Sequence, residues 1–351
     1  MIGISMNLSI HNIWLCWNLF KKGKSRTKEF RIFEYELEKN LLQLHSDLNR
    51  GIYKHGSYCQ FTVFDSKKRE IVVAPIRDRI VHRMVYEYLV PIFDKTFIYD
   101  VWSCRKGKGL QEAIERAQFF AKKYNHGYVW RTDIKKFFNS VDQNVLLKCI
   151  ERRIAGPPTL KIIQEIVSSY GTWENHKVKN LGKIVGLGER EREREREEAL
   201  RASNIGIPIG NLTSQIFSNI YFNEFDRFVI HSLKPKAYLR YGDDFLIFGT
   251  NRSSLEKIKS QAILFLQEKL NLSINPKNDI IVKSKQGLHF IGVDIFPFGR
   301  RLKKRNWKKV VNNLEEKNFS SYLGFVKKHS NRKKIRETNW RIYGLIEENI
   351  I

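Results

Sequence analysis

The stretch AYLRYGDDFLIFG (residues 237–249) places two adjacent acids, Asp243 and Asp244, between two β-rich runs. The pattern predicts a hairpin whose tip carries both carboxylates. Carboxylates at the end of an apolar strand are costly unless something binds them. A close pair of acids suits two hard divalent cations, which take oxygen ligands and stabilise the attacking and leaving oxygens of a phosphoryl displacement. A plain Asp-Asp turn is the alternative.

The composition favours a nucleic-acid partner. The chain has 351 residues, enough for a substantial core and two or three subdomains. Its 63 Lys and Arg against 37 Asp and Glu give a formal net charge of +26. Such an excess suits phosphates, because each neutralised phosphate releases a counterion. Aromatic residues, at 13%, are interleaved with the basic ones and favour contact with bases. A generally basic solvated surface is the alternative.

Two further features bear on the compartment. The four cysteines are widely spaced and indicate reduced thiols, neither a disulfide framework nor a zinc site; they are Cys16, Cys59, Cys104 and Cys149. The apolar run at 13–17 is followed by basic residues, which is the wrong polarity for a signal peptide, and it is too short for a membrane span. We therefore expect an amphipathic helix there, and a soluble cytoplasmic protein with no membrane partner.

Hydrophobic spacing predicts helices and strands along most of the chain. Strands are expected at 61–64, 71–73 and 129–133, with a further β-hairpin around 279–297. Helices are expected at about 29–50, 79–88, 110–123, 143–154, 160–169, 212–231 and 253–269. In the basic tail, the expected core residues are Trp307, Tyr322, Phe325 and Trp340. The low-complexity block at 186–201, rich in Glu and Arg, predicts a solvated insertion without chemistry.

A third acid, Asp133, ends the strand expected at 129–133. Alone it would more often cap a helix N-terminus. Followed about 110 residues later by Asp243 and Asp244, it gives the layout that brings three carboxylates to two metals.

At this point the sequence resembles the reverse transcriptases, and the matching segments follow one another in the expected order. They are 68–69, 75–82, 103–109, 133–138, the YxDD box at 241–244, and 288–292. The segment GIPIGNLTSQ (206–215) resembles the version typical of diversity-generating retroelements, whereas retroviral and group II intron enzymes usually carry Gln-Gly-x-x-x-Ser-Pro. Segments 219–228 and 296–305 resemble that family too. The sequence departs from the family pattern at two places. The Glu- and Arg-rich insertion lies just before Gly206, and Gly242 replaces the bulkier residue common in the YxDD box.

The resemblance implies a right-hand polymerase of the α/β (α+β) class, with fingers and palm built on an antiparallel sheet with helices, and a small helical thumb. The expected division is a helical extension at 1–50, fingers with palm segments at 51–132, a palm at 133–298 interrupted by the insertion at 186–201, and a basic thumb at 299–351.

The resemblance also implies roles for individual residues. Asp133, Asp243 and Asp244 would bind two Mg²⁺ ions, with Mn²⁺ as an alternative, and would catalyse attack of a primer 3′-hydroxyl on the α-phosphorus of a dNTP. The residues implied to bind the dNTP are Lys68, Arg69, Phe138, Ile209, Gly210, Ser214 and Gln215. Those implied to contact nucleic acid are Arg77, Arg79, Arg105, Tyr241, Arg300, Arg301, Lys303, Lys304 and Arg305.

Several of these roles have structural alternatives. Phe138 is implied to be a steric gate against a ribose 2′-hydroxyl; alternatively it is core and Phe137 faces the pocket. Lys68 and Arg69 alternatively form a solvated turn. The three arginines Arg77, Arg79 and Arg105 alternatively make salt bridges with Asp78 or Asp100.

Ile209 has a mechanistic consequence of its own. A Gln at this position can hydrogen-bond near the nucleotide sugar and base, whereas an Ile cannot. A misfit then leaves no polar group unpaired, so selectivity falls. In the family, misincorporation occurs chiefly opposite template adenines. Alternatively, Ile209 simply packs the palm.

We therefore interpret the sequence as an RNA-directed DNA polymerase that makes error-prone, adenine-mutagenic cDNA in a diversity-generating retroelement of a bacterium, archaeon or phage. The implied partners are template RNA, a primer or cDNA strand, dNTPs and a small basic accessory variability protein. One rival is another bacterial reverse transcriptase of the retron, group II intron-like or phage-defence kind. The other is a catalytically silent RNA-binding protein on the same fold.

Overall fold

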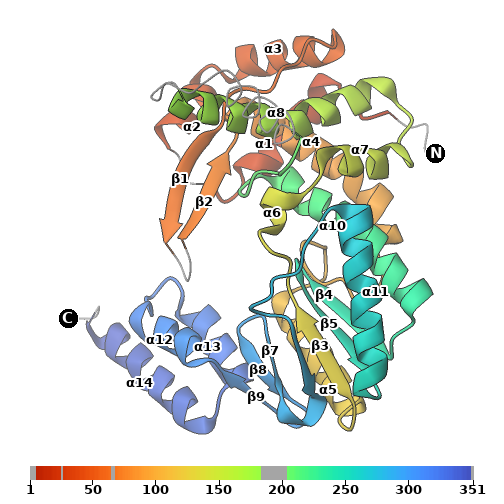
Figure 1. The fold of residues 1–351 in the computed structure, drawn as a ribbon. Coiled ribbons are helices and arrows are strands. Elements are labelled where there is room, and N and C mark those ends of the chain that lie inside the picture. The colour runs from red at the N-terminus through yellow and green to blue at the C-terminus, as the bar shows by residue number, and fades with distance from the viewer. Residues whose placement is uncertain (1–4, 25–26, 65–67, 183–203, 349–351) are drawn as a thin grey trace. The chain divides into compact units, whose positions relative to one another are not determined.

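The computed structural model describes residues 5–24, 27–64, 68–182 and 204–348 (Figure 1). The insertion expected at 186–201 lies outside these residues. The chain forms two compact units, each assembled from separated segments. The first combines Met1–Ile98, Lys135–Arg227 and Leu264–Ser273; the second combines Tyr99–Ile134, Phe228–Ile263 and Ile274–Ile351. The sequential boundaries of fingers, palm and thumb stay predictions.

Helices dominate the first unit. Helix α1 packs on α3 and α4 and buries Ile13 and Trp17, as its amphipathic pattern predicts. The Trp17 ring stacks on Phe30 of α2, with the ring centroids 5.2 Å apart. The elements of this unit are α1 (Ile10–Lys21), α2 (Lys28–Tyr35), α3 (Leu37–Asn49), β1 (Cys59–Phe64), β2 (Lys68–Val73), α4 (Ile76–Phe93), α6 (Phe137–Ser140), α7 (Gln143–Glu151), α8 (Pro157–Gly182) and α10 (Leu212–Phe228).

The second unit contains two antiparallel sheets. The larger has the strand order β4-β5-β3-β6, and the smaller has the order β7-β8-β9. Their strands are β3 (Tyr128–Thr132), β4 (Ala237–Tyr241), β5 (Asp244–Gly249), β6 (Ile280–Lys283), β7 (Leu288–Phe290), β8 (Val293–Phe296) and β9 (Gly299–Leu302). The helices are α5 (Leu110–Lys123), α12 (Lys304–Asn312), α13 (Phe319–His329), α14 (Arg332–Glu348) and the part of α11 (Arg252–Leu270) that precedes Leu264.

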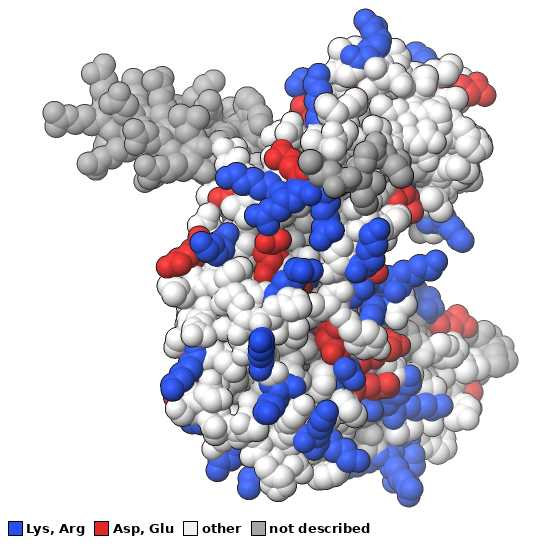
Figure 2. All heavy atoms as spheres, turned by 90° about the vertical axis from the view of Figure 1, so that its right-hand side faces the viewer, with Lys and Arg blue, Asp and Glu red and all other residues white. Residues whose placement is uncertain are grey.

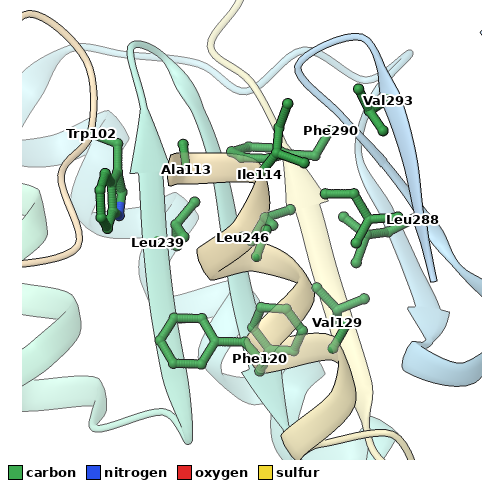
Figure 3. Close-up of a cluster of buried hydrophobic side chains, with 14 of the residues drawn as sticks. Trp102, Ala113, Ile114, Phe120, Val129, Leu239, Leu246, Leu288, Phe290 and Val293 are labelled. Carbon is green, nitrogen blue, oxygen red and sulfur yellow. The ribbon is translucent and has the colours of Figure 1, made fainter. Parts of the chain in front are cut away.

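A buried hydrophobic core joins α5 to both sheets (Figure 3). Successive side chains of a strand point to opposite faces. Val129 of β3 therefore joins α5 on one face, whereas Trp130 lies on the other and meets the Phe245 ring edge to face at 5.4 Å. Because β3 is buried on both faces, it holds the residue that follows it in a fixed place. The labelled core residues include Ala113, Ile114, Phe120, Val129, Leu239, Leu246, Leu288, Phe290 and Val293.

The hairpin expected around 279–297 is wrong as a single hairpin. Strand β6 instead pairs with β3, with Lys283 opposite Tyr128. The chain then turns through Gly287, whose φ is +84° and whose added Cβ would lie 2.4 Å from the Phe296 ring. Only glycine fits there, and the strands that follow form the separate smaller sheet.

Two helical expectations also need correction. The helix expected over 29–50 is interrupted at Glu36, whose backbone is non-helical, and so becomes α2 and α3. Trp307, Tyr322 and Phe325 pack against the core as expected, but Trp340 is 75% exposed. Helix α14 buries Thr338 and Ile342, four residues apart on one stripe, so Trp340 between them faces away.

The expected α/β class, with helices and antiparallel sheets, is confirmed. Among the described residues, no helix combines the length and the hydrophobicity that crossing a bilayer requires.

Candidate active site

The two adjacent acids lie at a two-residue turn between β4 and β5. Tyr241 pairs with Asp244, so Gly242 and Asp243 form the loop. Gly242 has φ +65°, and glycine is favoured at the first loop position of such hairpins for this reason. A side chain there would find space, because the nearest atom, Oγ of Ser103, is 4.0 Å away. The departure from the usual box therefore reflects backbone conformation.

Two neighbours hold this turn. The Gly242 amide donates to Oγ of Ser103 at 2.9 Å. The Arg240 guanidinium donates to the Gly242 carbonyl, also at 2.9 Å, and Arg240 is fully buried. The turn that presents the acids is therefore tied to its own strand and to the segment before α5.

Asp133 reaches the same end of the sheet by strand pairing. Strand β3 is antiparallel to β5, with Thr132 opposite Phe245. Asp133 follows Thr132 directly, and Asp244 precedes Phe245. Antiparallel pairing therefore brings Asp133 next to the acid pair, as the sequence predicts.

Asparagine side chains hold Asp133 in position. Nδ2 of Asn278 donates to one carboxylate oxygen at 2.9 Å, and Nδ2 of Asn275 donates to the other at 3.4 Å. The Asn275 amide also donates to the Asp133 carbonyl at 2.8 Å. Next to these residues, Asp279 accepts from Nε1 of the buried Trp130 at 2.7 Å and fixes the loop.

Arg131 is the third partner that the sequence reading missed. Its guanidinium lies 3.4 Å from a carboxylate oxygen of Asp244, and its side chain is buried. The only sequence signals were an Arg two residues before Asp133 and a polar loop after α11. Neither signal indicates that Arg131 contacts Asp244 or that the loop after α11 contacts Asp133.

Electrostatics singles out Asp243. Burial is the largest cause that raises the pKa of Asp243 to about 6, and the nearby carboxylates of Asp244 and Asp133 raise it further. Arg240 acts in the opposite direction. Like charges gathered in a partly buried site are stabilised by a bound cation.

The chemistry of these donors fits Mg²⁺, which prefers carboxylate oxygens together with substrate phosphates. Asp133, Asp243 and Asp244 would hold it. Among the described residues, however, no three His, Cys, Asp or Glu side chains already lie at the spacing that holds one ion. Hydrogen bonds from Asn275 and Asn278 engage Asp133, and an ion pair with Arg131 engages Asp244.

In the first unit, the segment around Ile209 is docked on β2. The Val72 amide donates to the Ile209 carbonyl at 2.8 Å. Asn211 bridges the same strand: its Nδ2 donates to the Val72 carbonyl at 2.8 Å, and its Oδ1 accepts from the Ala74 amide at 3.1 Å. Gly210 allows this approach, because an added Cβ would lie 2.8 Å from Cγ2 of Ile71.

A backbone hydrogen bond links Phe138 to this segment. The Ile207 amide donates to the Phe138 carbonyl at 2.8 Å. Phe137 is buried and packs on Phe222 at 4.7 Å between ring centroids, whereas Phe138 is half-buried. The alternative in which Phe138 is core and Phe137 is accessible is therefore wrong.

Two other residues of the segment differ in accessibility. Ser214 is buried and donates to the Pro208 carbonyl at 2.6 Å, so it supports the loop from inside. Gln215 is exposed on α10. Of the two, only Gln215 offers its side chain to solvent.

Comparison with known proteins decides the family. The family model described as reverse transcriptase (RNA-dependent DNA polymerase) matches residues 52–295. The chain belongs to the reverse transcriptase family. Among curated relatives, Protein YkfC of Escherichia coli (strain K12) is 24% identical over 263 residues, which cover 65% of this chain and 63% of YkfC.

Two other relatives carry intron names. Putative COX1/OXI3 intron 2 protein of Saccharomyces cerevisiae is 20% identical over 313 residues, covering 73% of this chain and 34% of that protein. Group II intron-encoded protein LtrA of Lactococcus lactis subsp. cremoris is 22% identical over 295 residues, covering 65% and 44%. The chain thus spans from about a third to under two thirds of these relatives' length.

One solved structure that resembles this chain is that of apo telomerase from Candida tropicalis, truncated from its C-terminal domain. It is 13% identical with a TM-score of 0.47, covering 71% of this chain and 55% of that one.

Two of the arginines predicted to contact nucleic acid make ion pairs. Arg77 lies 2.6 Å from Asp47 and 3.4 Å from Asp78. Arg79 lies 3.1 Å from Glu29. Arg77 therefore makes the ion pair with Asp78 that the alternative named, whereas the partner of Arg79 is Glu29, and contact of either arginine with nucleic acid stays a prediction.

Arg105, Lys68 and Arg69 are the other residues of these N-terminal segments with a predicted role in binding substrate. Arg105 donates to the Val101 carbonyl at 3.2 Å, while Asp100 pairs with Arg116 at 2.8 Å. Lys68 and Arg69 belong to strand β2, not to a turn, and Arg69 is exposed.

The basic tail is arranged around one cavity of about 740 Å³. Strand β9 supplies Arg300 and Arg301, and the start of α12 supplies 303–305. Among the described residues that line it, Asp294 is the one acid, and it lies 3.4 Å from Arg301. More generally, Lys and Arg side chains are spread over the face drawn in Figure 2, with acidic side chains among them.

Proposed function

We propose that this chain is an RNA-directed DNA polymerase that extends a primer strand by two-metal nucleotidyl transfer. The observation that carries the proposal is the strand register that brings Asp133 to the end of the sheet where Asp243 and Asp244 lie, in a chain of the reverse transcriptase family. Three carboxylates with no role in catalysis would only destabilise that end.

In the proposed reaction, the primer 3′-hydroxyl attacks the α-phosphorus of a dNTP, the new phosphodiester bond forms, and pyrophosphate leaves. Two bound Mg²⁺ ions supply charge stabilisation at the attacking and leaving oxygens. The protein orients this site: Asn275 and Asn278 hold Asp133, and Arg131 holds Asp244 until substrate arrives. Template RNA, a primer strand and dNTPs are the proposed substrates.

Primer extension tests the activity. Purified full-length protein, an annealed RNA template and DNA primer, dNTPs and Mg²⁺ are expected to give full-length cDNA, and chelation is expected to stop synthesis. The matched control is the doubly substituted Asp243→Ala/Asp244→Ala protein. If product is equally abundant with this control, or is absent even when cellular RNA and the neighbouring genes are supplied, the silent RNA-binding alternative stands.

We further propose that the cDNA is error-prone opposite template adenines, as in diversity-generating retroelements, with a small basic accessory protein as partner. Ile209 supports this. Its segment is held on β2 by hydrogen bonds from the Val72 amide and from the Asn211 side chain. The Ile209 side chain takes no part in these hydrogen bonds. The intron names of two relatives favour the rival class of group II intron-like enzymes.

Replacing Ile209 with Gln is expected to lower misincorporation opposite adenine by about 10-fold, because the added amide leaves an unpaired polar group when the base pair fits badly. Sequencing of cDNA from both proteins measures this. Ile209→Leu is the matched control and should keep the wild-type spectrum. An accurate wild-type enzyme would assign the chain to the rival class, whereas an error spectrum that Gln leaves unchanged would refute the role of Ile209.

A further inference from the structure

A second surface of the sheet-containing unit combines an exposed ring with basic side chains. The turn between β8 and β9 carries Phe298, which is 79% exposed. A cavity of about 530 Å³ lies at this turn, and none of the described residues that line it is acidic. These residues are Asn125, His126, Lys285, Phe296, Pro297, Phe298, Gly299, Arg300 and Arg301. We call this surface, together with the neighbouring Lys122, the Phe298 patch.

The patch lies away from the acids within the same unit. His126 precedes β3, whose five residues run from Tyr128 to Thr132, and Asp133 follows at the other end. At about 3.3 Å per residue, β3 separates the two ends by roughly 17 Å. A ligand on the patch would therefore be distinct from the reacting groups.

One cation lies near each of the two aromatic rings of this turn, the exposed Phe298 and the half-buried Phe296. Nζ of Lys122 lies 5.8 Å from the centroid of the Phe298 ring, and the Arg301 guanidinium lies 5.6 Å from that of Phe296. Lys122, Lys285 and Arg301 are all exposed. Arg301 also contacts Asp294 at 3.4 Å, so the two lysines carry most of the uncompensated charge.

The turn that presents Phe298 is held in place. The Phe296 ring packs against Gly287, which has no room for a side chain. Nε2 of Gln118 on α5 donates to the Phe296 carbonyl at 3.2 Å, and Pro297 is buried. Because the backbone of this turn is held in place, ordering it costs little entropy when Phe298 makes a contact.

We propose that the Phe298 patch binds an unpaired segment of single-stranded nucleic acid. A base stacks on Phe298, and flanking phosphates lie near Lys122 and Lys285. Aromatic stacking beside cations is how proteins bind single strands without reading their sequence. The proposal rests on the proposed function, which supplies a template strand that continues beyond the acids.

Fluorescence anisotropy tests the proposal with two labelled RNA–DNA hybrids. Both present the same primer end, and one also carries a single-stranded RNA tail long enough to cross the sheet. Phe298→Ala is expected to weaken binding of the tailed hybrid by about 5- to 150-fold, since stacking of one base contributes that much. Binding of the tail-free hybrid should not change. Phe298→Trp should restore tight binding, and Tyr343→Ala, another exposed aromatic in this unit, should have no effect.

The salt dependence of binding tests the role of Lys122 and Lys285 separately. The double substitution Lys122→Gln/Lys285→Gln is expected to reduce the slope of log affinity against log salt by about 0.7 per phosphate contact removed. Equal binding of the tailed hybrid by Phe298→Ala and Tyr343→Ala would overturn the proposal and point to a protein partner. An equal loss on both hybrids would overturn it too. Tail-dependent binding without any primer extension would support the patch and refute the polymerase activity instead.

Discussion

Asp243→Asn is expected to abolish nucleotide addition and, at the same time, to stabilise the metal-free protein. The rate of cDNA synthesis should fall on the order of 10³-fold, because an amide cannot supply the negative charge that holds the metals. Asn has nearly the same shape as Asp, so packing at the turn between β4 and β5 is retained. Loss of activity therefore reports on charge.

The gain in stability follows from the pKa of about 6 for Asp243 in the folded protein. In the unfolded chain an Asp has a pKa of about 3.9. Between these values the folded state binds more protons, so the free energy of unfolding decreases as pH rises from about 4 to 6. A shift of about two units corresponds to roughly 3 kcal/mol at pH 7 as an upper bound. The neutral Asn variant escapes this penalty.

Urea unfolding between pH 4 and 7 without divalent ions measures the difference. The variant should match the wild type near pH 4 and exceed it in stability by up to about 3 kcal/mol at pH 7. Added Mg²⁺ should stabilise only the wild type, because the ion binds the folded acids. Glu256→Gln, at an exposed pair on α11, is the control. A variant that keeps polymerase activity, or whose stability relative to the wild type is the same at pH 7 as at pH 4, contradicts the assignment of Asp243.

Phe138→Ala is expected to relax the choice of sugar. If the half-buried Phe138 ring blocks a ribose 2′-hydroxyl, removing it should raise ribonucleotide use relative to deoxynucleotide use by about 100-fold. The backbone at this position is held by the hydrogen bond from the Ile207 amide, so the change acts on the ring alone.

Single-nucleotide incorporation, with matched dNTP and rNTP at a primer end, measures the ratio of kcat/KM. Phe138→Tyr keeps the ring and should keep the selectivity. Phe137→Ala, by contrast, removes a buried ring and should cost about 3–5 kcal/mol of stability. Unchanged selectivity in Phe138→Ala would refute the steric gate.

Local pattern was enough to predict the acid-bearing hairpin, helix α5, and the strand that ends before Asp133. Each depends on neighbours in the chain: alternation of apolar residues, a turn glycine, and an amphipathic stripe. The same kind of reading failed for the hairpin expected at 279–297 and for Trp340. In the first case β6 pairs with β3. In the second, α14 packs with the face that carries Thr338 and Ile342, so Trp340 is exposed.

The partners of the acids were beyond the reach of sequence patterns. Asn275 and Asn278 lie more than 140 positions from Asp133 in the chain, and Arg131 meets Asp244 across 113 positions. Such pairs form only when antiparallel pairing of β3 with β5 and the loop anchored at Asp279 bring distant segments together. Residue type and spacing thus identified which side chains can do the chemistry. Strand register and hydrogen bonds decided how they are held, because those contacts depend on distances in space that local sequence does not encode.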